Sequence, residues 1–286
     1  MSSTTTEPGG RRAVAGRLAG RIAVIVGAGQ TDGATIGNGR AVAVTFAREG
    51  ARLVLVDRDL DSARVTAQMA ATAAADAGHE HPEPTVAGVD IAADDGPSRI
   101  VAAAVDAFGG FDVLHNNVGI GMGDGPPHRL SDDAYDRIMD VNLRAMWRTC
   151  REAVPVLRAQ ERSAIVNVSS LAAIAAASNQ TAYKLSKAGV DALTQNLALT
   201  GAKHQMRANA ILPGFIDTPM AVDAAASFLD VDRGEYAAAR AAMVPLRHQG
   251  SAWDVANAAL FLASDEAAFI TGVCLAVDGG QSARVG

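Results

Sequence analysis

From Arg21 onward, short runs of β-branched residues alternate with longer alanine-rich stretches, and this alternation restricts the fold more than any other feature. Runs such as RIAVIV (21–26) and RLVLVD (52–57) are apolar almost throughout, which is typical of strands buried on both faces. Strands that alternate with helices form parallel sheets with right-handed crossovers and a layer of helices on each face. The sequence therefore predicts an α/β fold, a doubly wound parallel sheet of about seven strands.

Further strands are expected at TVAGVD, DVLHNN, AIVNVSS, RANAIL and GVCLAVD, with helices around 97–108, 133–159, 183–203 and 252–264. No internal repeat or linker-like break in composition interrupts the pattern, which indicates one domain over residues 17–286. Residues 1–16 are polar and contain Gly and Pro, which is typical of a flexible leader. Residues 218–250 lack a strand and follow a strand end, so we expect them to form a substrate lid.

Composition excludes several classes of function. The chain has 286 residues, a formal charge of −6 and a pI of about 5.5, which disfavours nucleic acid and anionic membrane surfaces as partners. No apolar run is long enough to span a membrane. The two cysteines are far apart, as in a reduced, cytoplasmic protein. The histidines are not clustered as a metal site requires, and His115 is expected to be a hydrogen-bonded core residue.

A glycine-rich turn, VGAGQTDGATIGNGRA, joins the first strand to the first helix. Glycines there let backbone N–H groups and a helix N-terminus approach a phosphate, although a turn without a ligand could have the same letters. The second strand ends at Asp57, which could accept hydrogen bonds from an adenosine ribose or cap the next helix; Asp59 could cap it instead. A ribose-binding carboxylate favours NAD over NADP, whereas the neighbouring Arg58 leaves NADP open as the alternative.

In TAYKLSK, Tyr183 precedes Lys187 by one helical turn, so both side chains share a face of the predicted helix. A phenol beside an ammonium suggests proton transfer, but a surface contact would have the same spacing. Lys184 points about 100° away from Tyr183 and is expected to be solvated.

Several motifs follow one another in the order and spacing of a known family. They are NNVG (116–119), VNL around Asn142, NVSS ending at Ser170, YKLSK, and PGFIDT (213–218). From about residue 18 to 282 the chain resembles the short-chain dehydrogenase/reductase family, whose members have a single-domain Rossmann-type fold.

This resemblance implies a catalytic set of four residues. Tyr183 would be the general acid/base for hydride transfer between the substrate and a nicotinamide cofactor. Lys187 would favour the phenolate and hold the nicotinamide ribose, Ser170 would orient the substrate oxygen, and Asn142 would hold a water that links Lys187 to solvent. A free phenol has a pKa of about 10, so we expect the neighbouring ammonium to lower the pKa of Tyr183.

The resemblance also implies the cofactor contacts. They are expected at Gly27, Gly37, Asn38, Gly39, Asp57, Arg58, Asp90, Ile91, Asn116, Gly119, Tyr183, Lys187, Pro213, Ile216 and Thr218. Asp90 and Ile91 would meet the adenine, Asn116 and Gly119 the adenosine ribose, and Ile216 the nicotinamide carboxamide.

The nucleotide turn departs from the family pattern, because about six residues are inserted between Gly27 and Gly37. The insertion (residues 30–35, QTDGAT) could arch over the pyrophosphate or bulge into solvent.

The sequence as a whole predicts an NAD(H)-dependent oxidoreductase that interconverts a secondary alcohol and a ketone. The alternatives are an NADPH-dependent carbonyl or 3-oxoacyl-thioester reductase and a non-catalytic nucleotide sensor. The resemblance further implies a homotetramer. Several apolar residues indicate a substrate with apolar surface: Met122, Phe215, Met220, Phe228, Tyr236 and Met243.

Overall fold

The computed structural model describes residues 16–80 and 83–284, so the predicted leader lies almost entirely outside the described residues. Seven strands form one sheet in the order β3-β2-β1-β4-β5-β6-β9, and every neighbouring pair is parallel. The strands are β1 (Ile22–Val26), β2 (Arg52–Asp57), β3 (Thr85–Gly88), β4 (Val113–Asn116), β5 (Ser163–Val168), β6 (Met206–Pro213) and β9 (Cys274–Val277). The predicted doubly wound sheet is confirmed.

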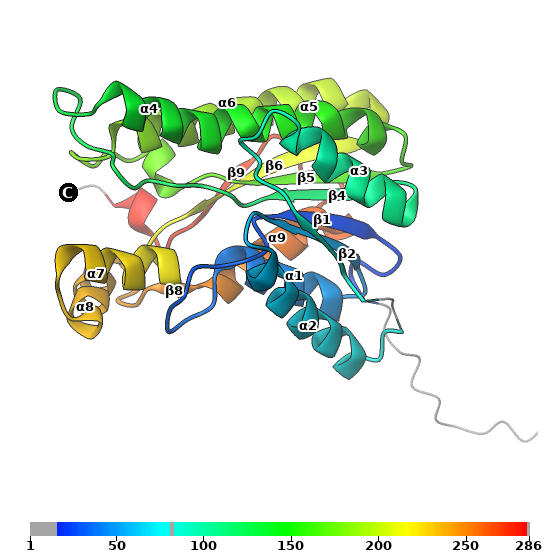
Figure 1. Ribbon diagram of the computed structural model, residues 1–286, viewed down its shortest axis with the longest axis horizontal. Coiled ribbons are helices and arrows are strands. Elements are labelled where there is room, and N and C mark those ends of the chain that lie inside the picture. Colours follow the sequence, from blue (N-terminus) through cyan, green and yellow to red (C-terminus); the bar gives the residue numbers. More distant parts are fainter. Residues whose placement is uncertain (1–15, 81–82, 285–286) are drawn as a thin grey trace, which may run out of the picture.

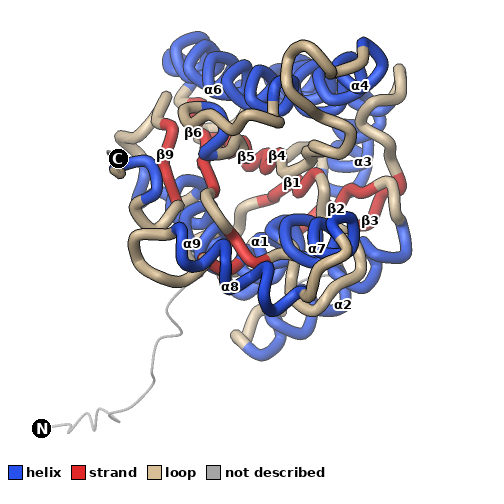
Figure 2. Tube along the Cα trace, turned by 90° about the vertical axis from the view of Figure 1, so that its left-hand side faces the viewer, coloured by secondary structure: helices blue, strands red, loops and turns tan. Residues whose placement is uncertain are grey.

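Helices cover both faces of this sheet (Figures 1 and 2). On one face lie α1 (Asn38–Arg48), α2 (Leu60–Asp76) and α9 (Ala252–Ala263), and on the other α3 (Gly96–Phe108), α5 (Ala145–Arg158) and α6 (Thr181–Gly201). Short 3-10 turns occur at Leu171–Ala173, Ala202–His204, Asp265–Ala267 and Gln281–Ala283. The strands are buried on both faces because each face carries its own hydrophobic cluster.

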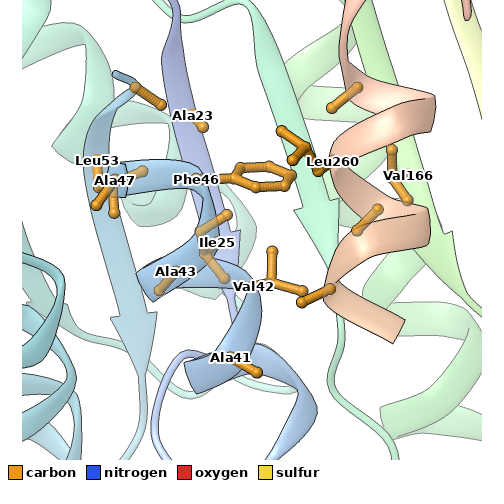
Figure 3. Packing of buried hydrophobic residues seen from close by; sticks show 14 of the residues in the cluster. Ala23, Ile25, Ala41, Val42, Ala43, Phe46, Ala47, Leu53, Val166 and Leu260 are labelled. Atoms are coloured by element: carbon orange, nitrogen blue, oxygen red, sulfur yellow. The ribbon is translucent and has the colours of Figure 1, made fainter. Parts of the chain in front are cut away.

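Packing against α1 shows why this helix lies so close to the sheet. Small side chains on its inner face, such as Ala43 and Ala47, are fully or almost fully buried. Between them Phe46 projects into the space bounded by Ile25 of β1 and Leu260 of α9 (Figure 3). Burying such a side chain contributes about 1.5–3 kcal/mol. This contact fixes the helix that begins directly after the nucleotide turn.

His115 in β4 is buried as predicted, but the expectation that it is hydrogen-bonded is wrong. Its ring is 0% exposed and lies edge-on to Phe46, with 6.3 Å between the ring centroids. Within the described residues, neither ring nitrogen has a hydrogen-bond partner. Burial lowers the pKa of His115 to about 3, so the ring is neutral in the folded protein over most of the pH range.

The stretch predicted as one helix over 133–159 consists of three parts. These are α4 (Asp132–Met139), a π-helical turn (Asp140–Arg144) and α5. Single π-helical turns inside helices are uncommon and often occur at functional sites. This turn carries Asn142, one of the four residues predicted to be catalytic.

Residues 218–250 contain helices and are bordered by two very short strands. Strands β7 (Ile216–Asp217) and β8 (Gly250–Ser251) pair with each other in parallel, at the two ends of the segment. Between them lie a π-helical turn (Pro219–Asp223), α7 (Ala224–Leu229) and α8 (Arg233–Met243). In Figure 1, α7 and α8 lie at the same end of the molecule as the loop that precedes α4. The segment therefore lies beside the crevice in which ligands of such sheets bind.

Candidate active site

The first two turns of α6 bring Tyr183 and Lys187 together. Lys187 is only 2% exposed, and its Nζ lies 5.7 Å from the centroid of the Tyr183 ring. The same Nζ donates a hydrogen bond of 2.9 Å to the carbonyl oxygen of Val168, the last residue of β5. The spacing of four residues thus places both side chains on one helix face, and the sheet holds the amine in place.

Ser170 follows β5 and meets the same tyrosine. Its hydroxyl is hydrogen-bonded to the hydroxyl of Tyr183 and accepts from the Ala172 N–H at 3.1 Å, which caps the 3-10 turn at Leu171–Ala173. The Tyr183 and Ser170 side chains are half-buried. The two hydroxyls are therefore close enough to bind one substrate oxygen jointly.

Asn142 is fully buried and ties the loop after β4 to α6. Its Oδ1 accepts from the Ile120 N–H at 2.7 Å, and its Nδ2 donates to the Ile120 carbonyl at 2.8 Å and to Ser186 Oγ at 3.0 Å. Ser186 in turn donates to the Tyr183 carbonyl. The side-chain amide is thus occupied by protein groups, and the expected water relay through Asn142 stays a prediction.

The charges of the pair differ from what the sequence suggested. Burial raises the pKa of Tyr183, and the hydrogen bond from Ser170 opposes this only in part. Burial also lowers the pKa of Lys187 to about 8, while the charge of Asp191 raises it. For the protein's own groups taken alone, the expected net lowering of the Tyr183 pKa is therefore wrong. At neutral pH the site holds a protonated phenol beside an ammonium.

Two glycines after β4 let the main chain approach these side chains. A Cβ at Gly119 would lie 2.9 Å from Lys187 Nζ, and a Cβ at Gly121 would lie 3.4 Å from the Tyr183 ring. Any larger residue at position 119 would displace the amine. The predicted role of Gly119 at the cofactor ribose is not tested by this contact, but the close approach explains why glycine is needed.

The nucleotide turn also depends on close backbone contacts. Gly27 has a φ of +84°, a left-handed conformation that favours glycine, and a Cβ at Gly39 would lie 1.9 Å from the Gly27 carbonyl oxygen. That oxygen accepts a hydrogen bond of 3.1 Å from Asn117 Nδ2. The sequence argument named Asn116 and missed Asn117, although both belong to the NNVG motif.

The N-terminus of α1 has the features of a phosphate site. Its N-cap is Gly37, which has no side chain to bind the first amides. In the described residues, Oδ1 of Asn38 is buried without a hydrogen-bond partner. Gln30 from the insertion closes the turn, because its Oε1 accepts from the Gly37 N–H at 2.8 Å. These residues fit the pyrophosphate of a dinucleotide.

Asp57 lies at the end of β2 beside this turn. Its two carboxylate oxygens accept from the N–H groups of Gly29 (2.8 Å) and Asp59 (3.0 Å), which leaves lone pairs for ribose hydroxyls. Asp59 caps α2 by accepting from the Ser62 N–H, so Asp57 does not serve as that cap. Arg58 is exposed.

Three predicted adenosine contacts lie near the next strand ends. Asp90 is exposed and accepts from the Ala92 N–H, whereas Ile91 is 7% exposed. Asn116 is 3% exposed and donates to Asn167 Oδ1 at 2.9 Å inside the sheet. Its side chain is therefore committed to the interior, and its predicted ribose contact stays a prediction.

The remaining predicted contacts lie between β6 and the segment predicted to be a lid (residues 218–250, called the lid segment below). Pro213 ends β6, and Ile216 in β7 is 4% exposed. Thr218 is 6% exposed and accepts from the Ala221 N–H at 3.3 Å, which caps the π-helical turn of the lid segment. Nothing in these contacts tests their predicted binding to the nicotinamide.

The insertion contacts the lid segment, which neither sequence-based alternative included. A Cβ at Gly33 would lie 2.7 Å from Pro219 Cβ, and the Ala34 N–H donates to Asp223 Oδ1 at 3.0 Å. Arg233 of α8 pairs with Asp223 at 3.0 Å and with Asp217 at 2.6 Å. We refer to Ala34, Asp217, Asp223 and Arg233 as the lid anchor.

Lys184 is not solvated as expected. Its Nζ donates to the carbonyl oxygens of Ala172 (3.2 Å), Ala173 (3.2 Å) and Ala175 (2.8 Å). The reason is that the chain after Ser170 packs against α6 at this point. The ammonium thus binds the segment that carries the predicted substrate-orienting serine.

A cavity of about 910 Å³ lies away from the predicted catalytic set. It is bordered by the insertion, α1, α2, α8 and the start of α9, and none of the four predicted catalytic residues lines it. Among the described residues, no group of three or more His, Cys, Asp or Glu side chains is placed to hold a metal ion. In that part of the chain no helix has the length and hydropathy needed to cross a bilayer.

Comparison with known proteins identifies the family. Residues 33–282 match a family model described as enoyl-(acyl carrier protein) reductase. The chain is 32% identical to 2-(R)-hydroxypropyl-CoM dehydrogenase of Xanthobacter autotrophicus, over 92% of this chain and 99% of that protein. It is 34% identical to 3-oxoacyl-[acyl-carrier-protein] reductase of Thermotoga maritima, over 92% and 98%.

A solved structure agrees with these relatives. The crystal structure of carveol dehydrogenase from Mycobacterium avium in complex with NAD has a TM-score of 0.83 and 29% identity, over 94% of this chain and 100% of that chain. The matches extend over nearly the whole described sheet and its helices. The chain belongs to the short-chain dehydrogenase/reductase family of NAD(P)-dependent oxidoreductases.

Proposed function

We propose that this protein interconverts a secondary alcohol and a ketone by hydride transfer to or from NAD(H), with Tyr183 as the general acid/base. The observation that carries the proposal is the contact of the Tyr183 and Ser170 hydroxyls next to a buried ammonium. Positioned acid–base groups typically contribute about 10²–10⁴-fold to a rate. When bound at the nucleotide turn, the nicotinamide cofactor supplies or accepts the hydride.

The protein's residues handle the proton and the substrate oxygen. In ketone reduction, the Tyr183 hydroxyl gives its proton to the carbonyl oxygen while Ser170 donates a hydrogen bond to the same oxygen. Lys187 stabilises the phenolate that remains. In alcohol oxidation the phenolate takes the hydroxyl proton back. A protonated phenol at neutral pH favours the reductive direction, because the acid is already in the form that reacts.

NAD is the proposed cofactor because Asp57 lies beside the nucleotide turn, half-buried and with spare lone pairs. A carboxylate there binds ribose hydroxyls and repels a 2′-phosphate. Turnover with NADH and NADPH, in the unmodified protein and in Asp57→Ala, tests this. A preference of the unmodified protein for NADPH would make the second candidate correct, an NADPH-dependent reductase of carbonyls or 3-oxoacyl thioesters. The similarity to the Thermotoga maritima reductase favours that candidate.

The proposed substrate has apolar surface, because apolar side chains are exposed in the loop after β4, in the turn after Ser170 and in residues 218–250. Met122 follows Gly121 and is 70% exposed, Ile174 ends the turn after Ser170, and Met220 lies in the lid segment. We propose that residues 218–250 cover such a substrate as a lid. A panel of alcohols and ketones of rising hydrophobicity should show KM falling as apolar area increases.

Tyr183→Phe separates this function from a nucleotide sensor. The variant keeps the ring but loses the proton, so kcat should fall about 10²–10⁴-fold while NAD(H) binding measured by calorimetry stays within twofold. Undiminished turnover in the variant would contradict the mechanism, and a protein that binds NAD(H) without turning over any panel substrate would be a sensor.

We also propose a homotetramer, formed through α5, α6 and the C-terminal edge of the sheet. Apolar side chains on these elements are exposed in the single chain, among them Trp147 of α5, Leu185 and Leu199 of α6, and Phe269 before β9. A contiguous patch of such side chains across these elements would favour a protein interface. Sedimentation equilibrium would show about four times the chain mass, and a monomer would refute the assembly.

A further inference from the structure

The N-terminus of α6 is capped by a residue from a distant loop. Asp124, in the loop after β4, accepts hydrogen bonds from the N–H groups of Thr181 (3.1 Å), Ala182 (3.1 Å) and Tyr183 (2.7 Å). Gln180, the residue in the N-cap position, makes no side-chain cap bond. One carboxylate thus replaces the local cap and binds three successive amides.

These bonds restrain the residue proposed as the acid. A helix N-terminus leaves four N–H groups without partners, and the carboxylate satisfies three of them. Charge-assisted bonds of this kind are about twice as strong as neutral ones, and the helix dipole adds to the attraction. The shortest bond goes to Tyr183 itself. A second contact, from Thr181 Oγ1 to the Gly125 carbonyl at 2.7 Å, holds the same loop to the same turn.

Lys184 does the equivalent for Ser170. A lysine ammonium has three donors, and all three contacts of this one go to carbonyl oxygens of 172–175, at the C-terminal end of the 3-10 turn. Ser170 caps the other end of that turn. A cation at the carbonyl end of a helical turn is favourable, so the lysine holds the segment against α6.

We propose that Asp124 and Lys184 are positioning residues that set the distance between the Tyr183 and Ser170 hydroxyls, a role that rests on the proposed function. Asp124 fixes where α6 begins, and Lys184 fixes where the serine segment lies against that helix. Asp124 binds the N–H of Tyr183 and Lys184 is the next residue, so both contacts act on the same turn of α6. A displacement of about 1 Å between reacting groups can cost about 10²-fold in rate.

The test compares Asp124→Ala, Asp124→Asn and Lys184→Met with two matched controls. Ser131→Ala removes an ordinary N-cap from α4, and Lys203→Met removes an exposed lysine. We expect kcat to fall about 10- to 100-fold in Asp124→Ala and about tenfold in Lys184→Met. Asp124→Asn should recover part of the loss, because its amide oxygen still accepts. The cofactor Kd should stay within twofold, and the controls should keep their kcat.

A readout that needs no turnover distinguishes this proposal from the proposed function. The chain has three tyrosines, so the ¹³C NMR signal of Tyr183 can be assigned in Cζ-labelled protein with Tyr183→Phe. Asp124→Ala and Lys184→Met should shift that signal, and Asp124→Ala should speed amide exchange in residues 181–187. If the unmodified protein turns over no substrate, the signal alone decides. An unchanged signal together with an unchanged kcat would overturn the positioning role, even if both variants melt earlier.

Discussion

The first turns of α6, which carry the proposed catalytic pair, and the lid anchor are both held by charged side chains, but in different surroundings. Lys187 is 2% exposed and binds a main-chain carbonyl, whereas the side chains of Arg233 and Asp217 in the lid anchor are 32% and 27% exposed. Buried polar contacts are costly to break, while half-exposed ion pairs contribute little and are screened by salt. The first turns of α6 are thus held more firmly than residues 217–233, which supports the proposal that residues 218–250 act as a lid.

The α8 helix strengthens this contrast. None of the residues of α8 is buried, so the helix is held mainly by the lid anchor and a few side-chain contacts. By comparison, α6 buries seven of its residues, Ala182, Ser186, Lys187, Val190, Thr194, Ala198 and Gly201. Segments with few buried contacts open at low free-energy cost. In the proposed function, such an opening of residues 218–250 would admit the substrate and leave the proposed catalytic residues in place.

Removing the buried amine should have the largest effect. In Lys187→Met, kcat should fall about 10²–10⁴-fold because the phenolate loses its neighbouring charge. In the unmodified protein, ketone reduction should decline as pH rises through about 8, since burial lowers the pKa of Lys187 to about 8 and the ammonium is lost above it. The pH–rate profile checks this, with Lys203→Met as control. A profile whose basic limb survives in Lys187→Met would show that another group titrates.

The sheet beneath the catalytic turn should be sensitive to acid. The pKa of His115 is about 3 when folded and about 6.5 when unfolded, so the unfolded chain binds one more proton between these values. The contribution of His115 to the free energy of unfolding is then complete above about pH 6.5. It falls by about 1.4 kcal/mol per pH unit between about pH 6.5 and 3. In His115→Leu, urea denaturation at pH 4 and pH 7 should differ less than in the unmodified protein. An equal pH dependence in both would show that folding does not lower the pKa of His115. The protonated ring would then have a hydrogen-bond acceptor in the folded protein.

Separating the insertion (residues 30–35) from the lid segment should have an intermediate effect on substrate KM. A side chain at position 33 would press on Pro219 and Asp223, at 2.7 and 2.9 Å. One added methyl group lies at the low end of the overpacking cost, about 1 kcal/mol, so substrate KM in Gly33→Ala should rise about fivefold with kcat unchanged. Gly88→Ala, whose Cβ would meet Leu60 at an ordinary 3.5 Å, is the control. A fall in kcat instead would mean that the insertion supports the chemistry directly.

Loss of the ion pairs should have the smallest effect. Arg233→Met keeps the apolar stem but removes both pairs, which are worth about 1 kcal/mol or less, so KM should rise a few-fold. In 1 M NaCl, which weakens partly exposed ion pairs, the unmodified protein should approach the variant. The variant itself should not respond. A salt effect of equal size in both would place the sensitive charges elsewhere.

Acid should also release the lid anchor. Partial burial opposes ionisation of Asp223, but hydrogen bonds from the Ala34 N–H and Arg233 outweigh it and lower its pKa. The anchor is therefore complete above the ordinary range of a carboxyl and is lost as pH falls below it. The two regions thus fail at opposite ends of the pH scale, the catalytic pair in base and the lid anchor in acid.

Sequence reasoning reached the parts of the site that depend on local spacing. Tyr183 and Lys187 share a helix face because they are four residues apart, and Asp59 caps α2 as its position allowed. Asp124 could not be found in this way. It lies 59 residues before Tyr183, and the glycines and prolines around it (GMGDGPP, 121–127) indicate only a loop.

The errors have the same origin. Lys184 was expected to be solvated because helical geometry gives only its direction, not the position of the chain that folds back to meet it. The contact of Gly33 with Pro219 likewise joins segments far apart in the sequence. The prediction for His115 failed because burial can be inferred from an apolar strand, whereas the partners of its ring nitrogens cannot.

The sequence by itself determined the sheet, its helical layers and the presence of a tyrosine–lysine pair on one face, because periodicity and short spacings act within a few residues. Only the tertiary structure decided which loops bind the first turn of α6, how the insertion meets the lid, and that burial raises rather than lowers the pKa of Tyr183. These depend on which distant backbone groups and apolar side chains surround a residue, and chain folding alone brings those together.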